Sequence, residues 1–310
     1  MDDGTTDKTP SGSAELRIAP PSMRYTAISQ LAIKDRKGFV PRQDCCEQCQ
    51  KTSPRIGRTS FYRDRQTMAS IPFSTLPYPA DPSANLTPFS ISVPDEELED
   101  LKTLLRLSHI AAPNWENSHD DGFFGIPRDV LVDVVKHWQN GYDWRKWEST
   151  LNSFPQYTIT IADDDGSIYT IHFLALFSPN PSAIPILLLH GWPGSVLEFL
   201  PLLQHVRAQH TAAPAELPYH VIVPHFVGYG FSSPPPRDRD FSHVDNARLV
   251  SKLMHALGFA SSSSGYVVQG GDLGGATAPV VASLDPACRL VHVNMLNIPP
   301  PEGVDVEADV

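Results

Sequence analysis

The stretch that organises this sequence is residues 267–276, VVQGGDLGGA, in which an apolar run meets a glycine turn with Asp272 at its tip. The apolar run predicts a buried strand, and the small residues after Asp272 predict the start of a helix. This is the layout of a nucleophile elbow, a sharp turn that holds one reactive side chain above a sheet. Glycines on both sides of Asp272 suit the unusual backbone angles of such a turn. Because a carboxylate is ionised at neutral pH, Asp272 can attack carbon without a base to remove a proton first.

The sequence around the elbow alternates between predicted strands and predicted helices. Strands are expected at 186–189, 219–224, 266–269 and 290–294, and helices at 196–207, at 245–257 and from the elbow to residue 284. Such alternation predicts an α/β fold with a mostly parallel sheet and flanking helices. In these sheets the reactive groups gather at the carboxyl ends of the strands.

Two loops follow strands at that same edge of the predicted sheet. HGWPG occupies 190–194 and GYGFS occupies 228–232. A loop of the first kind can aim a backbone N–H group at the reaction centre, and the residue after the nucleophile supplies a second one. We therefore expect an oxyanion hole made by the N–H groups of Trp192 and Leu273.

Residues 80–177 have a different sequence pattern, which predicts two amphipathic helices followed by a hairpin. The sequence SVPDEE at 92–97 predicts a helix start with Ser92 as a hydroxyl cap and carboxylates in the first turn, and a second helix follows Pro127. Each helix has one apolar face, so both are expected to lie on a larger body. Strands at 157–161 and 168–177 flank the turn sequence DDDG. We interpret His172, in the second of these strands, as a hydrogen-bonded structural residue rather than a catalytic one.

Composition and missing motifs exclude several classes of function. The net charge of −11 argues against a general nucleic-acid-binding protein, which needs cations to neutralise phosphates. The sequence contains no G-x-x-x-x-G-K, no G-x-S-x-G and no dinucleotide-binding glycine pattern. It also lacks an apolar run of about 20 residues, so we expect no transmembrane segment. We expect a cytoplasmic protein, with peripheral association with the endoplasmic reticulum as the alternative.

The two ends of the sequence are expected to lie outside the folded part. Residues 1–67 mix Gly, Ser, Pro and charges without a sustained period, which predicts a disordered extension, and Met68 is the expected natural start. Cys45, Cys46 and Cys49 lack a second ligand pair nearby, so we expect no metal site. Residues 299–310 read as an acidic tail.

The motifs, taken in order, resemble a known family. HGWPGSVLEF, VGYGFSSPP, KLMHALGF and VVQGGDLGG are similar to the α/β-hydrolase epoxide hydrolases of the microsomal and juvenile-hormone type. Upstream, PFSISVPDEELEDLK and YDWRKWESTLNSFPQYTI resemble the N-terminal epoxide hydrolase domain. The resemblance implies an N-terminal domain at 68–183, with a meander and the first hairpin of the core, followed by a partial hydrolase core at 184–298.

The resemblance also implies a mechanism and a substrate class. Asp272 attacks a carbon of a small-molecule epoxide to give an alkyl-enzyme ester, and water then hydrolyses the ester to a vicinal diol. The oxyanion rests on the N–H groups of Trp192 and Leu273. In the family, tyrosines of a cap region protonate the epoxide oxygen, and a histidine held by a carboxylate activates the water. Neither a cofactor nor a metal ion is implied.

This sequence departs from the family pattern in two places. Leu273 stands where the family usually has tryptophan, although a backbone donor survives that change. The sequence ends soon after Asp272, and His292, the one later histidine, resembles a structural position. We therefore expect a truncated hydrolase lacking its cap and last strands, inactive or limited to a single turnover. A non-catalytic protein of the same fold and a haloalkane dehalogenase-like hydrolase are the alternatives.

Overall fold

A computed structural model describes residues 71–119, 121–260 and 265–295. The expectations for the first 67 residues, for the three cysteines there, for Met68 and for the tail at 299–310 lie outside the described residues.

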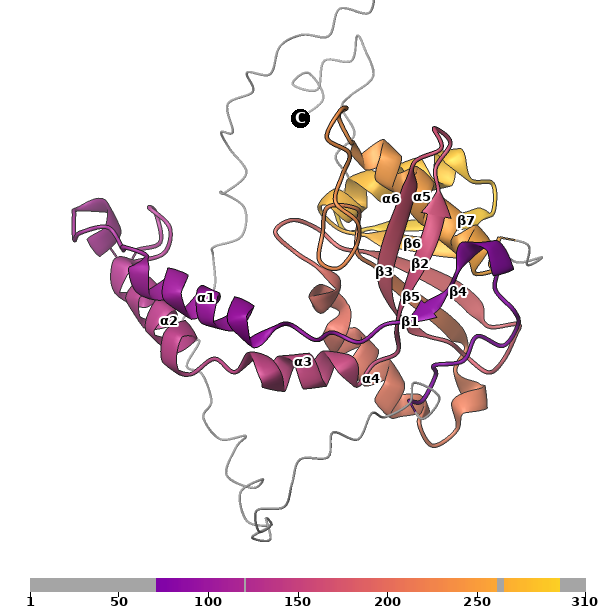
Figure 1. Cartoon of the computed structure of the whole chain (residues 1–310), viewed down its shortest axis with the longest axis horizontal. Coiled ribbons are helices and arrows are strands. Elements are labelled where there is room, and N and C mark those ends of the chain that lie inside the picture. The colour runs from indigo at the N-terminus through magenta and orange to yellow at the C-terminus, as the bar shows by residue number, and fades with distance from the viewer. Residues whose placement is uncertain (1–70, 120, 261–264, 296–310) are drawn as a thin grey trace, which may run out of the picture. The chain divides into compact units, whose positions relative to one another are not determined.

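The centre of the fold is a seven-stranded sheet with the order β1-β2-β3-β5-β4-β6-β7 (Figure 1). The strands are β1 (Thr87–Pro88), β2 (Gln156–Ala162), β3 (Ile168–Leu176), β4 (Ile184–Leu189), β5 (Tyr219–Pro224), β6 (Tyr266–Gly270) and β7 (Cys288–Val293). Strands β4 to β7 form the predicted parallel part. The first three strands extend the same sheet in antiparallel fashion, with β3 paired to β5. The predicted α/β fold is therefore confirmed, and the hairpin before residue 184 belongs to the same sheet as the strands after it.

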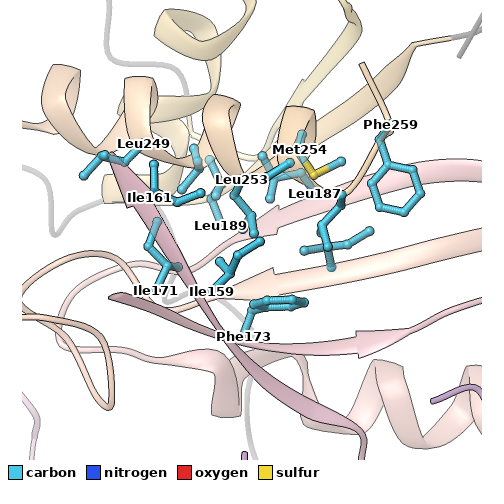
Figure 2. Close-up of a cluster of buried hydrophobic side chains, with 14 of the residues drawn as sticks. Ile159, Ile161, Ile171, Phe173, Leu187, Leu189, Leu249, Leu253, Met254 and Phe259 are labelled. Atoms are coloured by element: carbon cyan, nitrogen blue, oxygen red, sulfur yellow. The ribbon is translucent and has the colours of Figure 1, made fainter. Parts of the chain in front are cut away.

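Helices cover both faces of this sheet, as the continuous apolar run of β4 predicted. On one face, Leu187 and Leu189 join a core with α5 (His243–Ala256) and α6 (Leu273–Leu284), and Figure 2 shows side chains of α5 above strands β2, β3 and β4. On the other face, Leu188 packs in a second core with residues of α3 (Trp144–Asn152) and α4 (Leu200–His210). The candidate site loops extend from β4, which is covered on both faces, and from its neighbour β6.

Helix starts differ from the sequence prediction in their capping groups. Helix α1 (Asp95–Leu107) has Pro94 as its N-cap and no side-chain cap, so the predicted hydroxyl cap from Ser92 is wrong. The first-turn carboxylates are present, and Asp95 pairs with Arg145 of α3. This ion pair ties the start of α1 to α3, but it does not replace a cap, because arginine cannot accept from backbone N–H groups. By contrast, α5 does begin with a capping box, in which Ser242 and Asp245 bond each other's backbone.

Helix α2 (Arg128–Asn140) lies beside α1, and Figure 1 shows the two as a helical pair. Only Leu105 of α1 is buried, and α2 has no buried residue. Apolar side chains on this pair remain exposed, among them Leu104, Val130, Leu131, Val134 and Trp138. The expectation that both helices lie on a larger body is therefore not met within the described residues. A hydrogen bond joins the two helices, from Gln139 Nε2 to Leu105 O at 2.8 Å.

The described residues also form four short 3-10 helices, η3 (Pro82–Ala84), η4 (Glu116–Ser118), η5 (Val196–Phe199) and η6 (Pro214–Glu216). Helix α4 follows η5 directly, so the helix expected at 196–207 forms with a tighter first turn. None of the helices described here is long and apolar enough to span a bilayer.

Candidate active site

Asp272 lies at the junction of β6 and α6, where the strand turns sharply into the helix. Its backbone angles are φ 53° and ψ −119°, a positive φ that a residue with a side chain rarely adopts. Such backbone strain is typical of functional turns, where the surrounding structure holds the residue in place. The residue is solvent-exposed at the crest of the turn. The chain thus forms the predicted elbow with Asp272 at its tip.

Close packing of α6 against β4 fixes the angle of this elbow. A Cβ atom at Gly274 would lie 2.2 Å from the backbone oxygen of Leu189, a separation that real atoms do not reach. Because the clash is with backbone rather than a mobile side chain, only glycine lets the first turn of α6 pass this close to the strand. Gly274 therefore sets how the helix leaves the elbow.

The register between β4 and β6 brings the loop that follows β4 close to Asp272. Strands β4 and β6 are parallel neighbours, with Leu189 opposite Gly270. Both strands end at the same edge of the sheet, so residues just after Leu189 lie beside residues just after Gly270. Trp192 and Asp272 are 80 residues apart in sequence and in hydrogen-bond contact.

Two backbone donors converge on one oxygen of Asp272. The N–H group of Trp192 donates to Asp272 Oδ1 at 2.6 Å, and the N–H group of Leu273 donates to the same atom at 2.7 Å. The other oxygen, Oδ2, accepts no hydrogen bond from the residues described. The carboxylate is therefore held by one oxygen while the other is left available.

A cavity of about 260 Å³ opens beside the carboxylate. It is lined by Gly191, Trp192, Pro193, Gly194, Glu198, Gly271, Asp272 and Asn294. Two apolar side chains near the carboxylate are exposed, with Trp192 67% and Leu273 37% accessible to solvent. A small cavity that combines two carboxylates with apolar neighbours such as Trp192 and Pro193 can receive a compact molecule.

Comparison with known proteins points to one family. Residues 86–199 match the family described as "Epoxide hydrolase N terminus", and residues 184–304 match the "alpha/beta hydrolase fold". A "Putative epoxide hydrolase" of Dothistroma septosporum is 38% identical over 234 residues, which are 75% of this chain and 54% of the relative. The structure of Aspergillus niger epoxide hydrolase is similar with a TM-score of 0.67 at 47% identity, over 76% of this chain and 59% of the other. This chain belongs to the epoxide hydrolase family of the α/β-hydrolase fold.

Other members of the epoxide hydrolase family are more distant. "Epoxide hydrolase 1" of Oryctolagus cuniculus is 32% identical over 219 residues, covering 68% of this chain and 45% of the relative. The juvenile hormone epoxide hydrolase of Bombyx mori has a TM-score of 0.57 at 27% identity, over 70% of this chain and 56% of the other. The chain spans about half the length of the curated relatives it matches, 54% of the first and 45% of the rabbit protein.

His172 and His292, which the sequence analysis interpreted as structural residues, do not line the cavity beside Asp272. His172 is completely buried and hydrogen-bonds to Gln156 and His225, which agrees with its interpretation as a structural residue. His292 lies within β7 opposite Gln269 and does not line the cavity. The described residues contain no cluster of three or more His, Cys, Asp or Glu side chains that could hold a metal ion.

Two tyrosines that the sequence left unassigned have different surroundings. Burial, and to a smaller degree the negative charge of Asp272, raise the pKa of the Tyr229 hydroxyl. The charge of Asp272 thus acts on the Tyr229 hydroxyl, which stays protonated at neutral pH. Tyr266 is buried and donates to Asp285 Oδ2 at 2.8 Å, which commits its hydroxyl to a structural bond.

Sequence reasoning did not single out Glu198 or Asn294, which both line the cavity. Asn294 follows β7, and the rule that parallel strands end at one edge would have placed it beside the elbow. Glu198 lies four residues after Gly194, the spacing at which a helical turn carries a side chain back over the loop before it. Both signals were present in the sequence, but neither residue belongs to the elbow motif.

Proposed function

We propose that this protein is an epoxide hydrolase that converts a small-molecule epoxide into a vicinal diol through a covalent ester on Asp272. The observation that carries the proposal is the double hydrogen bond on Asp272 Oδ1, from the N–H groups of Trp192 and Leu273. These donors orient the carboxylate so that Oδ2 faces an incoming carbon atom.

In the first step, Asp272 Oδ2 forms a bond to one epoxide carbon while the bond from that carbon to the ring oxygen breaks. The electron pair of the broken bond stays on the ring oxygen, which takes up a proton and becomes the first hydroxyl of the product. The new ester joins Asp272 Oδ2 to the substrate, and its carbonyl oxygen is Oδ1.

In the second step, water attacks Cγ of the ester and loses a proton, and negative charge develops on Oδ1. The N–H groups of Trp192 and Leu273 are already in contact with that atom, so they stabilise the charge without rearrangement. The bond between Cγ and Oδ2 then breaks, the second proton of the attacking water passes to Oδ2, and Oδ2 leaves as the second hydroxyl of the diol. The carboxylate that remains contains the oxygen of the attacking water.

The residues that line the cavity include no histidine, the side chain that most often acts as the base toward water, and the Glu198 carboxylate is bonded to the Gly191 N–H group. We therefore expect this chain to form the ester faster than it hydrolyses it. The match of residues 86–199 to the epoxide hydrolase N terminus supports this function over haloalkane dehalogenation, which uses the same aspartate chemistry. A non-catalytic role is the second candidate, and the lack of a histidine among the cavity-lining residues favours it.

Intact-mass measurement after incubation with styrene oxide tests the proposal. We expect the protein to gain the mass of one styrene oxide, located on the peptide that contains Asp272. Asp272→Asn is the matched control, since its amide keeps the shape and lacks the nucleophilic charge. Absence of an adduct and of diol with the unaltered chain would support the non-catalytic candidate.

A further inference from the structure

The wall of the cavity beside Asp272 contains a second carboxylate, that of Glu198. Its two oxygens share the backbone N–H group of Gly191, at 3.1 and 3.4 Å. Gly191 is buried, whereas Glu198 is an exposed residue. A surface carboxylate thus satisfies a buried backbone donor in the site loop, and that donor is not available to an oxyanion.

The carbonyl oxygen of Gly191 is fixed as well. It accepts from Gly194 N at 3.0 Å and lies 3.0 Å from Nδ1 of His190. Phe226 N donates to His190 Nε2 at 3.2 Å, so Nε2 is the acceptor and the neutral ring carries its hydrogen on Nδ1. Burial lowers the pKa of His190, which keeps the ring neutral and this tautomer in place.

The carbonyl of Gly191 and the N–H group of Trp192 belong to the same planar peptide unit. An orientation imposed on the carbonyl is therefore imposed on the N–H group that points to Asp272 Oδ1 at 2.6 Å. Glu198 fixes the preceding peptide unit through the Gly191 N–H. The two anchors on Gly191 leave the Trp192 donor little freedom to rotate.

The fit between Glu198 and the loop is tight. A Cβ atom at Gly194 would lie 1.5 Å from Glu198 Oε1, so the carboxylate occupies the space that a side chain at residue 194 would need. Glu198 comes from η5, whose N-cap Ser195 accepts from Leu197 N at 3.3 Å. The carboxylate is thus presented to the loop by a short, capped turn.

We propose that Glu198 is a positioning residue, which holds the Gly191 backbone so that the Trp192 N–H group stays aimed at Asp272 Oδ1. This rests on the proposed function, because it gives Glu198 a part in the same ester chemistry. Glu198 acts through the loop backbone and does not itself touch the substrate.

Three variants separate this role from others. Glu198→Ala removes the acceptor, Glu198→Gln keeps an oxygen that can accept from Gly191 N–H but has no charge, and Glu216→Ala removes an exposed glutamate of η6 as a control. Two quantities are measured on each full-length variant: the hydrogen-exchange rates of the Gly191 and Trp192 amides by NMR without substrate, and the rate of ester formation with styrene oxide by intact mass.

In Glu198→Ala we expect both amides to exchange about tenfold faster and the ester to form about tenfold more slowly, the size of effect expected when a buried donor loses its partner. We expect Glu198→Gln to stay within about threefold of the unaltered chain in both measurements, because one acceptor oxygen suffices. Glu216→Ala should change neither.

Unchanged amide exchange in Glu198→Ala would overturn the proposal, and so would faster exchange with an unchanged rate of ester formation. A loss in Glu198→Gln as large as in Glu198→Ala would also overturn it, since the charge rather than the acceptor would then matter. If the unaltered chain forms no ester, the proposed function fails, while the amide exchange rates still decide whether Glu198 holds the loop.

Discussion

His172 and His225 face each other through their Nδ1 atoms, which are 2.9 Å apart in the interior beneath the candidate site. His172 lies in β3, and His225 directly follows β5. The Nε2 atom of His172 lies 3.0 Å from Gln156 Oε1, so Nε2 carries the hydrogen and the His172 Nδ1 accepts from His225. In this direction the bond requires a neutral His172, because a protonated Nδ1 cannot accept.

This arrangement predicts a loss of stability in mild acid. Burial lowers the pKa of His172 to about 3 and that of His225 to about 3, from 6.5 in the unfolded chain. Since the unfolded state binds protons that the folded state excludes, stability is full above pH 6.5 and falls as the pH drops toward 3. Each such histidine removes about 1.4 kcal/mol per pH unit within that window. Urea unfolding midpoints at pH 7, 6 and 5 test this, and equal midpoints would contradict it.

A second prediction concerns the ion pairs that join the β2–β3 turn to α5. Arg248 donates to both oxygens of Asp163 at 2.7 Å, and the Asp163 side chain is fully buried. Hydrogen bonds from Arg248 hold the pKa of Asp163 far below its usual value. We expect Arg248→Met to lower the free energy of unfolding by about 2 kcal/mol, because Lys252 remains near the buried carboxylate.

Lys102→Met is the control for that experiment. Lys102 pairs with Glu99 at 2.7 Å, but both side chains are more than half exposed. Solvent screens such a pair, so the expected loss is below about 0.5 kcal/mol. Urea unfolding of both variants at neutral pH gives the comparison, and similar losses for the two would contradict the structural role of Asp163.

Gly274→Ala is expected to disrupt the elbow. The added methyl group would lie 2.2 Å from the Leu189 backbone oxygen. Neither backbone segment can move to relieve this clash without separating α6 from β4. We expect a destabilisation of about 3 kcal/mol or more, as for severe overpacking. Ala276→Ser, at an exposed position of the same helix, should change the melting temperature little. Equal melting temperatures for the two variants would show that the helix does not need this close approach.

Isotope labelling tests which oxygen enters the product. If Asp272 Oδ2 becomes a hydroxyl of the diol, the first diol formed in ¹⁸O-water carries no label, and the label appears in Asp272 instead. Single-turnover product and the Asp272 peptide are both analysed by mass spectrometry. Labelled diol from the first turnover would indicate direct attack by water, and would rule out the ester.

Local sequence patterns predicted these strands and helices well, because the spacing of apolar residues and the residues that form turns act over only a few positions. The apolar run of β4, the glycine turn around Asp272 and the amphipathic stretch of α5 all formed within a few residues of the expected bounds. The sequence did not predict that Arg145, distant in sequence, pairs with Asp95 at the start of α1. Such a contact leaves no periodic signal.

The sequence by itself determined the order of strands and helices, the elbow and the identity of the residue at its tip, since these follow from short apolar runs and glycines. Only the tertiary structure decided that Gly191 is held by Glu198 and that His172 meets His225. These contacts depend on which strands become neighbours and in what register. Burial of apolar surface over the whole sheet sets that pairing, and no single segment encodes it.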